Sequence, residues 1–174
     1  MKAILKFVGL VLAVAIVAHV VALWALPRVV MDRTMATLQE LAGGKANVAL
    51  RPPPPDHASR TVVMPSPDLL YTICVYDLEQ GPVMLSAEQY PPGYWSLALY
   101  DARTDNFLTV NDTQEAGKPL RLVITEGTAP PGDARFVASS SRRGIALFRS
   151  LLLDPADRTA VDAARSTMEC RPVR

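Results

Sequence analysis

The residues from Ile4 to Leu26 form a long apolar run, interrupted near its start by Lys6, which constrains this chain more than any other feature of its sequence. A helix of about 23 residues is about 34 Å long, slightly more than a hydrocarbon core of about 30 Å. Beyond Lys6, His19 is the only polar side chain inside the run. The run predicts a transmembrane helix, with the lipid bilayer as the partner of residues 4–26.

A cleaved signal peptide is the rival interpretation, because Val20-Val21-Ala22 resembles a small-residue cleavage site. The apolar core of a signal peptide is usually about 7–15 residues long. This run continues past Trp24, an aromatic residue suited to a membrane interface. The sequence therefore favours an uncleaved transmembrane anchor over residues 1–27.

The basic residues around the run predict its orientation. Lys2 and Lys6 flank its start, which favours a cytoplasmic N-terminus and an exported C-terminal part. Arg28 and Arg33 follow the run and weaken this signal. We expect a single pass through the inner, cytoplasmic membrane, with the C-terminal domain in the periplasm.

The composition of the exported part excludes several classes of function. Setting Lys2 and Lys6 aside leaves 16 basic residues against 17 acidic ones, so no basic surplus points to nucleic acid as a partner. One of the two histidines, His19, lies in the apolar run, which leaves His57 beside the proline tract. A Ser-His-Asp triad or a multi-histidine metal site does not arise from this set, and we expect neither a metal nor a cofactor.

Residues 28–59 are predicted to form a helical stalk and a proline-rich linker. Met31, Met35 and Leu38 recur at helical spacing, and Gly43-Gly44 supplies a stop. This helix either continues the anchor or lies on the domain. The tract Pro52–Pro55 favours an extended polyproline spacer.

Residues 60–174 show the alternation and turn spacing of a β domain. Short strands without intervening helices predict a mainly β fold, an antiparallel sandwich of immunoglobulin-like or jelly-roll-like type. The predicted strands are 60–64, 69–78, 83–86, 93–101, 107–110, 120–125 and 135–138. In the clearest of them, Trp95 is expected to face the core between the sheets.

Two further points stay open, and one C-terminal element is predicted. Residues 144–153 suit a buried strand or a helix equally well. A short C-terminal helix is expected from Asp154-Pro155, with the small-residue face Ala156, Ala160, Ala163, Ala164 and Met168 packed inward. Cys74 and Cys170 either form a disulfide in an oxidising compartment or remain a core residue and a tail thiol.

An ordered set of motifs resembles the bacterial family of unknown function numbered 1254. The set comprises Asp68-Leu-Leu-Tyr71, Tyr76-Asp77-Leu78, Gly81-Pro82-Val83, Gly93-Tyr-Trp-Ser-Leu97 with Tyr100-Asp101, Thr104 to Phe107, and Arg149 with Asp154-Pro-Ala-Asp157. The resemblance covers about residues 60–168 and implies a β-sandwich in which 144–153 is a strand. Ser66 stands where the family usually carries Asn.

The resemblance also suggests a partner. Larger members of this family continue into a second β domain, numbered 1214, which this chain lacks. We therefore expect an interaction module of unknown biochemical activity that pairs with a separately encoded protein carrying that domain.

The alternative is an enzyme or small-molecule binder that uses a carboxylate and tyrosine pocket. Its weak catalytic candidates are Asp68, Tyr71, Asp77 and Asp101. Local backbone capping explains Asp77, and Asp101, Asp105 and Asn106 likewise suit turns. As a carboxylate cluster, these three residues could instead hold a cation or act in acid–base chemistry. The tyrosines suit cross-strand packing or a ligand platform. The segment 139–143, Ser-Ser-Ser-Arg-Arg, suits a solvated turn or an anion site.

Overall fold

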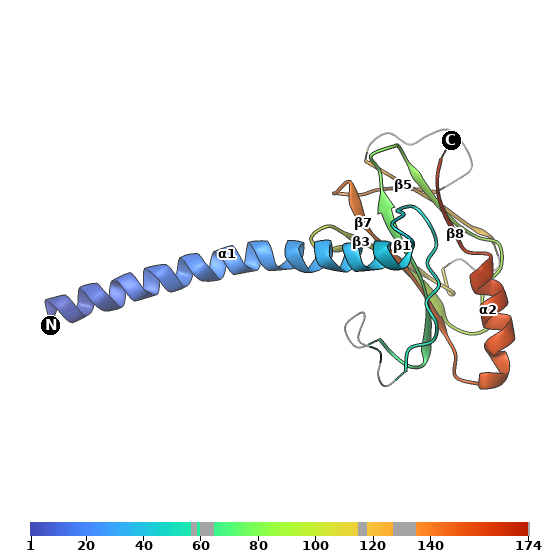
Figure 1. Cartoon of the computed structure of the whole chain (residues 1–174), viewed down its shortest axis with the longest axis horizontal. Coiled ribbons are helices and arrows are strands. Elements are labelled where there is room, and N and C mark those ends of the chain that lie inside the picture. The colour runs from blue at the N-terminus through green and yellow to red at the C-terminus, as the bar shows by residue number, and fades with distance from the viewer. Residues whose placement is uncertain (57–58, 60–64, 115–117, 127–134, 174) are drawn as a thin grey trace.

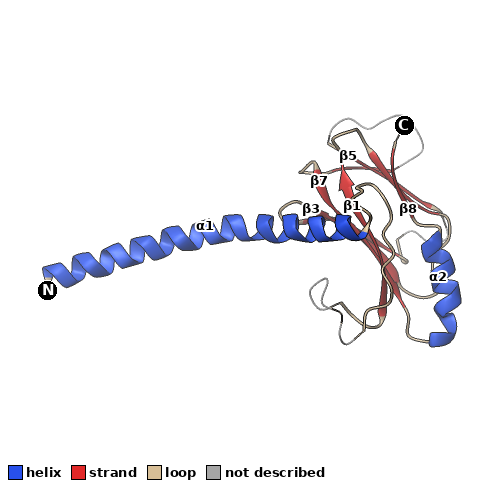
Figure 2. Cartoon of the chain, in the orientation of Figure 1, coloured by secondary structure: helices blue, strands red, loops and turns tan. Residues whose placement is uncertain are grey.

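A long N-terminal helix leads into two four-stranded β-sheets in the computed structural model (Figures 1 and 2). The structure describes residues 1–56, 59, 65–114, 118–126 and 135–173. The elements are α1 (Lys2–Leu41), β1 (Leu69–Asp77), β2 (Val83–Ala87), β3 (Trp95–Asp101), β4 (Asn106–Asn111), β5 (Leu120–Thr125), β6 (Arg135–Ala138), β7 (Arg143–Leu151), a 3-10 turn η1 (Pro155–Asp157), α2 (Arg158–Ser166) and β8 (Glu169–Pro172). The predicted mainly β fold with one helix at each end is confirmed.

The strands form one sheet in the order β1-β7-β3-β4 and a second in the order β6-β5-β2-β8. Neighbouring strands run antiparallel except β5 and β6, which are parallel. The antiparallel prediction is therefore wrong for this pair, because β6 enters the sheet in the same direction as β5. The strand at 144–153, left open from periodicity alone, is confirmed as β7.

Apolar side chains from both sheets form one buried cluster, which we call the inner core. Trp95 is 2% exposed within it and lies between two other rings. Its ring centroid is 4.3 Å from that of Tyr90 and 5.2 Å from that of Phe148, both in stacked geometry. The prediction that Trp95 faces the core is confirmed.

A second buried cluster, which we call the outer core, lies where the end of α1 crosses the first sheet (Figure 1). It consists of Met31, Met35, Leu38, Ile73, Val75 and Ile145. The spacing of the three helix residues therefore marks a packed face, as expected. Because β1 and β7 carry inner-core residues on their other face, these two strands are buried on both sides.

Helix α1 is continuous through Pro27 and ends at the two glycines. The helix thus both continues the apolar run and lies on the domain, the two arrangements that the sequence left as alternatives. Gly43 and Gly44 adopt φ of 69° and 78°, a left-handed region that favours glycine. The predicted helix stop is confirmed.

The segment after α1 is bonded to the domain rather than extending away from it. Leu50 forms an antiparallel bridge with Ile73 of β1. The Asn47 side chain donates to the Asp77 carbonyl and accepts from the Asp77 amide, at 2.8 and 2.7 Å. The carbonyl of Pro52 accepts from Arg165 at 3.1 Å. The predicted spacer thus contributes hydrogen bonds to the fold.

The C-terminal segment corrects two expectations. Asp154 caps the turn by accepting from the Ala156 amide at 2.8 Å, as predicted. The predicted face is confirmed for Ala164 and Met168, which are buried, and wrong for Ala156, Ala160 and Ala163, which are exposed. Besides Ala164, α2 buries Val161 and Arg165. Val161 offers more apolar area than any alanine, so its burial determines which face packs. Strand β8 was not predicted, since it is four residues long and contains a proline.

Cys74 of β1 and Cys170 of β8 form a disulfide, so the first of the two alternatives for these cysteines holds. The bond joins the first sheet to the second across 96 residues of sequence. The predicted strand 60–64 and the residue His57 lie outside the described residues.

Candidate functional site

The four predicted catalytic candidates separate into two pairs. Asp68 precedes β1 and Tyr71 lies near its start, whereas Asp77 ends β1 and Asp101 ends β3. A nine-residue strand is about 30 Å long, so Asp68 and Asp77 lie at opposite ends of the sheet. The structure therefore does not bring the four residues into one pocket.

At the first end, the described polar contacts of Asp68 and Tyr71 each involve a backbone group. The Tyr71 hydroxyl accepts from the backbone amide of Ser66 at 2.9 Å. The Asp68 carbonyl accepts from the amide of Leu152 at 2.9 Å, and the Asp68 side chain is exposed. Ser66, at the position where the resemblance leads one to expect Asn, thus contributes its backbone amide to the contact with Tyr71.

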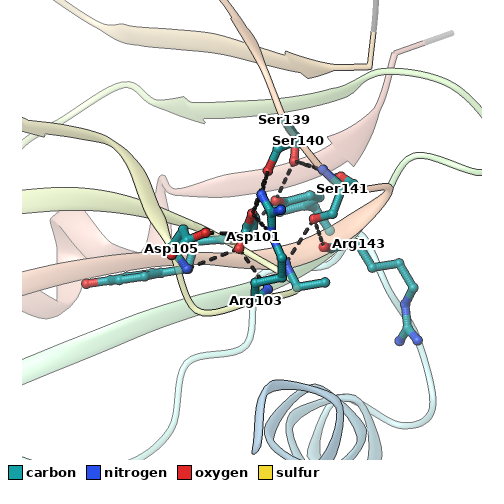
Figure 3. Close-up of polar contacts among 10 residues, drawn as sticks. Asp101, Arg103, Asp105, Ser139, Ser140, Ser141 and Arg143 are labelled. Atoms are coloured by element: carbon teal, nitrogen blue, oxygen red, sulfur yellow. Dashed lines mark hydrogen bonds and ion pairs between the residues drawn. The ribbon is translucent and has the colours of Figure 1, made fainter. Parts of the chain in front are cut away.

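At the second end, Asp101 is fully buried and holds the turn between β3 and β4 (Figure 3). Its Oδ1 accepts from the amides of Arg103 and Asp105 at 2.7 and 3.0 Å. Its Oδ2 accepts from the Arg103 guanidinium, at 3.2 Å from Nε and 3.0 Å from Nη2, and from the hydroxyl of Ser140. The turn holds Thr104 at φ 72°, a strained conformation for a β-branched residue, which these bonds maintain.

The hydroxyl of Tyr76 extends this polar network into the inner core. It donates to the Tyr100 carbonyl at 3.0 Å and shares a 2.9 Å hydrogen bond with Ser139. Gly144 makes room for this hydroxyl, because a Cβ at that position would lie 2.2 Å from the Tyr76 oxygen and 2.1 Å from the Tyr100 carbonyl oxygen. Only glycine fits without displacing backbone.

The surroundings shift the pKa values of both buried groups. Burial alone would raise the pKa of the Asp101 carboxyl, but the hydrogen bonds from Ser140, Arg103 and Asp105 outweigh it and lower that pKa. Burial raises the pKa of the Tyr76 phenol to about 12, although its hydrogen bonds with Ser139 and Ser141 oppose the shift. Asp101 is therefore a stable anion and Tyr76 a stable neutral phenol at neutral pH.

Asp77 has its own partners beside this network. Its carboxylate accepts from the Glu79 amide at 3.0 Å and pairs with Arg143 at 3.4 Å. Arg143 also donates to Gln39 of α1, so the end of this helix is bonded to this end of the sheet. Asp77 thus acts both as a turn cap and as an ion-pair partner.

These contacts occupy the groups that a ligand would need. A carboxylate has about four acceptor positions, and the Asp101 carboxylate receives five donors. In the segment 139–143, Ser139 donates to the Ser141 carbonyl and Ser141 to the Arg143 carbonyl, both at 2.7 Å. This arrangement is a polar clamp that ties the β3–β4 turn to the loop before β7, and it uses the Asp101 carboxylate for contacts within the chain.

The predicted cation cluster does not form. Asp105 pairs with Arg103 at 3.6 Å, and the Asn106 amide donates to the carbonyls of Leu99 and Leu108. Within the described ranges, no three side chains of His, Cys, Asp or Glu gather as a metal site would require. Of the five tyrosines, Tyr76 packs in the inner core and Tyr90 against it, Tyr71 and Tyr100 pack against the outer core, and Tyr94 is exposed.

Two arginines that the sequence did not single out join distant parts of the chain. Arg165 is 5% exposed and donates to Asp162, to the Pro52 carbonyl and to the Tyr71 carbonyl. Arg51 donates to the Arg165 carbonyl at 2.7 Å, at the end of α2. Their roles depend on contacts more than 90 residues apart, and no local pattern marks them.

An apolar groove of about 410 Å³ lies between the end of α1 and the proline tract. Leu38, Leu41, Leu50 and Ile73 line one part of it, and residues 51–55 line another. The groove carries few polar groups and lies apart from Asp77 and Asp101. It therefore brings no further polar group close to the predicted catalytic candidates Asp77 and Asp101.

Solved structures of other proteins share this architecture. A comparison with curated proteins finds no match. The structure is similar to the VPA0106 protein from Vibrio parahaemolyticus, with a TM-score of 0.68 and 13% identity over 87% of this chain and 36% of that one. It is also similar to an uncharacterized protein from Burkholderia cenocepacia, with a TM-score of 0.50 and 15% identity over 74% of this chain and 35% of that one.

These likenesses concern the fold, and this chain spans about a third of the length of both proteins. The family model described as a protein of unknown function, DUF1254, matches residues 46–172. This range includes every described strand and both candidate pairs. The chain therefore belongs to the DUF1254 family.

Proposed function

We propose that this protein is a membrane-anchored, exported interaction module that pairs with a separately encoded protein. The observation that carries the interaction role is the polar clamp, whose carboxylate and hydroxyls bond to one another. We expect the partner to carry a domain similar to the family numbered 1214.

The N-terminal helix supports the anchor. Helix α1 is long and apolar enough to cross a membrane, and its first 30 residues are almost entirely exposed. Near the end of the apolar run, the Arg28 guanidinium lies 4.2 Å from the centroid of the Trp24 ring and donates to the Trp24 carbonyl. Such a pair suits the outer interface of a bilayer, with Lys2 and Lys6 at the inner one.

The disulfide supports export. Disulfides persist in oxidising compartments and are rare in the cytoplasm. Cys74 and Cys170 are both buried, and their bond joins the two sheets. A periplasmic location for the domain agrees with this bond and with the basic residues that precede the apolar run.

The polar clamp argues against a small-molecule site at the second end of the sheet. Its carboxylate and hydroxyls already bond to one another. A pairing role requires surface, whereas a catalytic role requires acceptors that are free to meet a substrate. Pairing is therefore the function that the geometry supports best.

Reporter fusions test the anchor and its orientation. Alkaline phosphatase fused after Gly44 should be active, and a cytoplasmic reporter at the same position should be silent. The reverse pattern would refute the orientation. N-terminal sequencing of the membrane-bound protein should find residues 1–26 intact, whereas a new terminus near Leu23 would identify a signal peptide.

Co-purification tests the pairing. A neighbouring open reading frame that encodes an anchor and a domain similar to the family numbered 1214 supplies the candidate partner. The two full-length proteins, expressed together, should co-purify from solubilised membranes. An unrelated single-pass protein at the same level serves as the control. If the candidate partner is retained no better than this control, the pairing proposal fails.

A further inference from the structure

His19 is a polar side chain without a partner in its own chain. It lies inside the apolar run, it is exposed, and no described residue forms a hydrogen bond or ion pair with it. A polar group left unsatisfied in hydrocarbon costs several kcal/mol, so such a residue needs a partner from outside the helix. The imidazole therefore marks one face of α1 as a contact face.

The residues beside His19 allow another helix to come close. At 100° per residue, Ala15 lies about 40° and Ala22 about 60° from His19 around the helix axis, both on the same side. Small residues let two helix backbones approach, which brings polar side chains within hydrogen-bonding distance. Leu12 and Leu26 lie within about 20° of the same face.

The domain leaves this face free. His19 precedes Met31 by 12 residues, which rotates it by about 120° from the face that packs on the sheet. Because α1 is continuous, this rotation carries through to the domain. Beyond the apolar run, the His19 face continues through Val30 and Leu41, which are 47% and 54% exposed.

A second face of α1 also carries small residues, but the domain blocks it. Gly9 and Ala13 also form a pair of small residues at a spacing of four. Ala13 precedes Met31 by 18 residues, which is five full turns, so this pair points to the side on which the domain lies. A parallel second helix packed there would run into the sheet.

We propose that α1 pairs in parallel with a second copy of itself along the face that contains His19, which rests on the membrane anchoring proposed above. A neutral imidazole has one N–H donor and one acceptor nitrogen. In a parallel twofold pair, two His19 rings lie at the same depth, and one donates to the other. A second copy thus supplies the missing partner at the required depth and covers Val30 and Leu41.

The test measures association of the full-length protein in lipid vesicles by energy transfer between two labelled populations. Wild type should associate, and His19→Leu should weaken association roughly 3- to 30-fold, the range for a hydrogen bond between membrane helices. Ala15→Leu should also weaken it by blocking close approach. Ala13→Leu adds the same side chain on another face and should leave association unchanged.

Three outcomes overturn the inference. A wild-type protein that stays monomeric at every density shows that the His19 face does not bind a second copy. Equal association of wild type and His19→Leu removes the imidazole from the contact. Weakening by Ala13→Leu but not by Ala15→Leu would put the contact on the other face. In each case an intact N-terminus in the vesicles shows that the anchoring itself still holds. Loss of residues 1–22 would refute both the anchoring and the pairing of α1.

Discussion

The inner and outer cores bury the two faces of the same strands in different ways. The inner core is made of side chains from both sheets and includes stacked rings and the disulfide. The outer core has six buried residues, three of them from α1 and two of those methionines. The inner core is therefore closed by the β domain itself, whereas the outer core depends on the helix that carries the apolar run.

This difference has a consequence for where the domain begins. The family model starts at residue 46, after the helix has ended. The sheet face under Met31, Met35 and Leu38 nevertheless needs those residues, because Ile73, Val75 and Ile145 would be exposed without them. The end of α1 is thus part of the folded domain.

The largest effect is expected from Trp95→Ala in the inner core. Deleting a large buried aromatic costs about 3–5 kcal/mol, a substantial part of a typical stability of about 5–15 kcal/mol. Thermal unfolding of the full chain in detergent, followed by circular dichroism, measures the loss. Tyr94→Ala is the control, because the neighbouring Tyr94 is 42% exposed and should change little. Equal melting of the two variants would show that the Trp95 ring does not hold the sheets together.

Removal of the disulfide should rank next. The double variant Cys74→Ala with Cys170→Ala frees a loop of 96 residues, and loss of such a bond typically costs about 2–5 kcal/mol. Urea unfolding with and without reductant measures it. Reductant should destabilise wild type and leave the double variant unchanged. An unaltered wild-type midpoint in reductant would mean that the second sheet stays in place without the bond.

A smaller effect is expected in the outer core. Met35→Ala should cost about 2 kcal/mol, the lower end of the range for a buried methionine, since a helix packed on one side relaxes more easily than a strand between two layers. Val29→Ala lies on the same helix and is 46% exposed, so it serves as the matched control. Urea unfolding compares the two. A Met35→Ala midpoint equal to that of Val29→Ala would show that the packing of α1 on the sheet does not contribute to the stability of the domain.

The smallest effect concerns the polar edge of the inner core. The pKa of Tyr76 is raised to about 12 from an ordinary 10.0, so the neutral phenol stabilises the folded state fully below pH 10 and this contribution is lost as the pH rises toward 12. The loss is on the order of 2 kcal/mol. Tyr76→Phe should cost about 1 kcal/mol at pH 8 and abolish this part of the alkaline decline. Unfolding free energies measured from pH 8 to 11.5 provide the comparison, and parallel declines in both proteins would contradict it.

Sequence periodicity predicted the elements whose signal is local. The strand 120–125 and the strand 135–138 were placed at their observed limits, and the Met31 face and the Trp95 face were both correct. Each depends on alternation or helical spacing within a short window. The fold class follows from such windows because burial of one face is a local requirement.

The site could not be predicted in the same way. The predicted turn capping by Asp77 and Asp101 is confirmed, because both accept from backbone amides two to four residues further along the chain. Their contacts with Arg143 and Ser140 could not be predicted, since only the folded sheet brings these residues near. Strand β8 and the burial of Arg165 likewise depend on contacts far along the chain. Hydrophobic pattern does not report which donors will satisfy a buried carboxylate.

Because α1 is one continuous helix, a change in the tilt of the apolar run also moves the domain that is packed on its other end. From the middle of the apolar run near Ala15 to Leu38, which is held against the sheet, the helix rises about 35 Å. Transmembrane helices tilt by about 20° on average, and a tilt of that size would sweep the domain sideways by about 12 Å. If α1 spans a bilayer as proposed, its continuity to the sheet would let the thickness of the membrane influence the direction in which the domain faces.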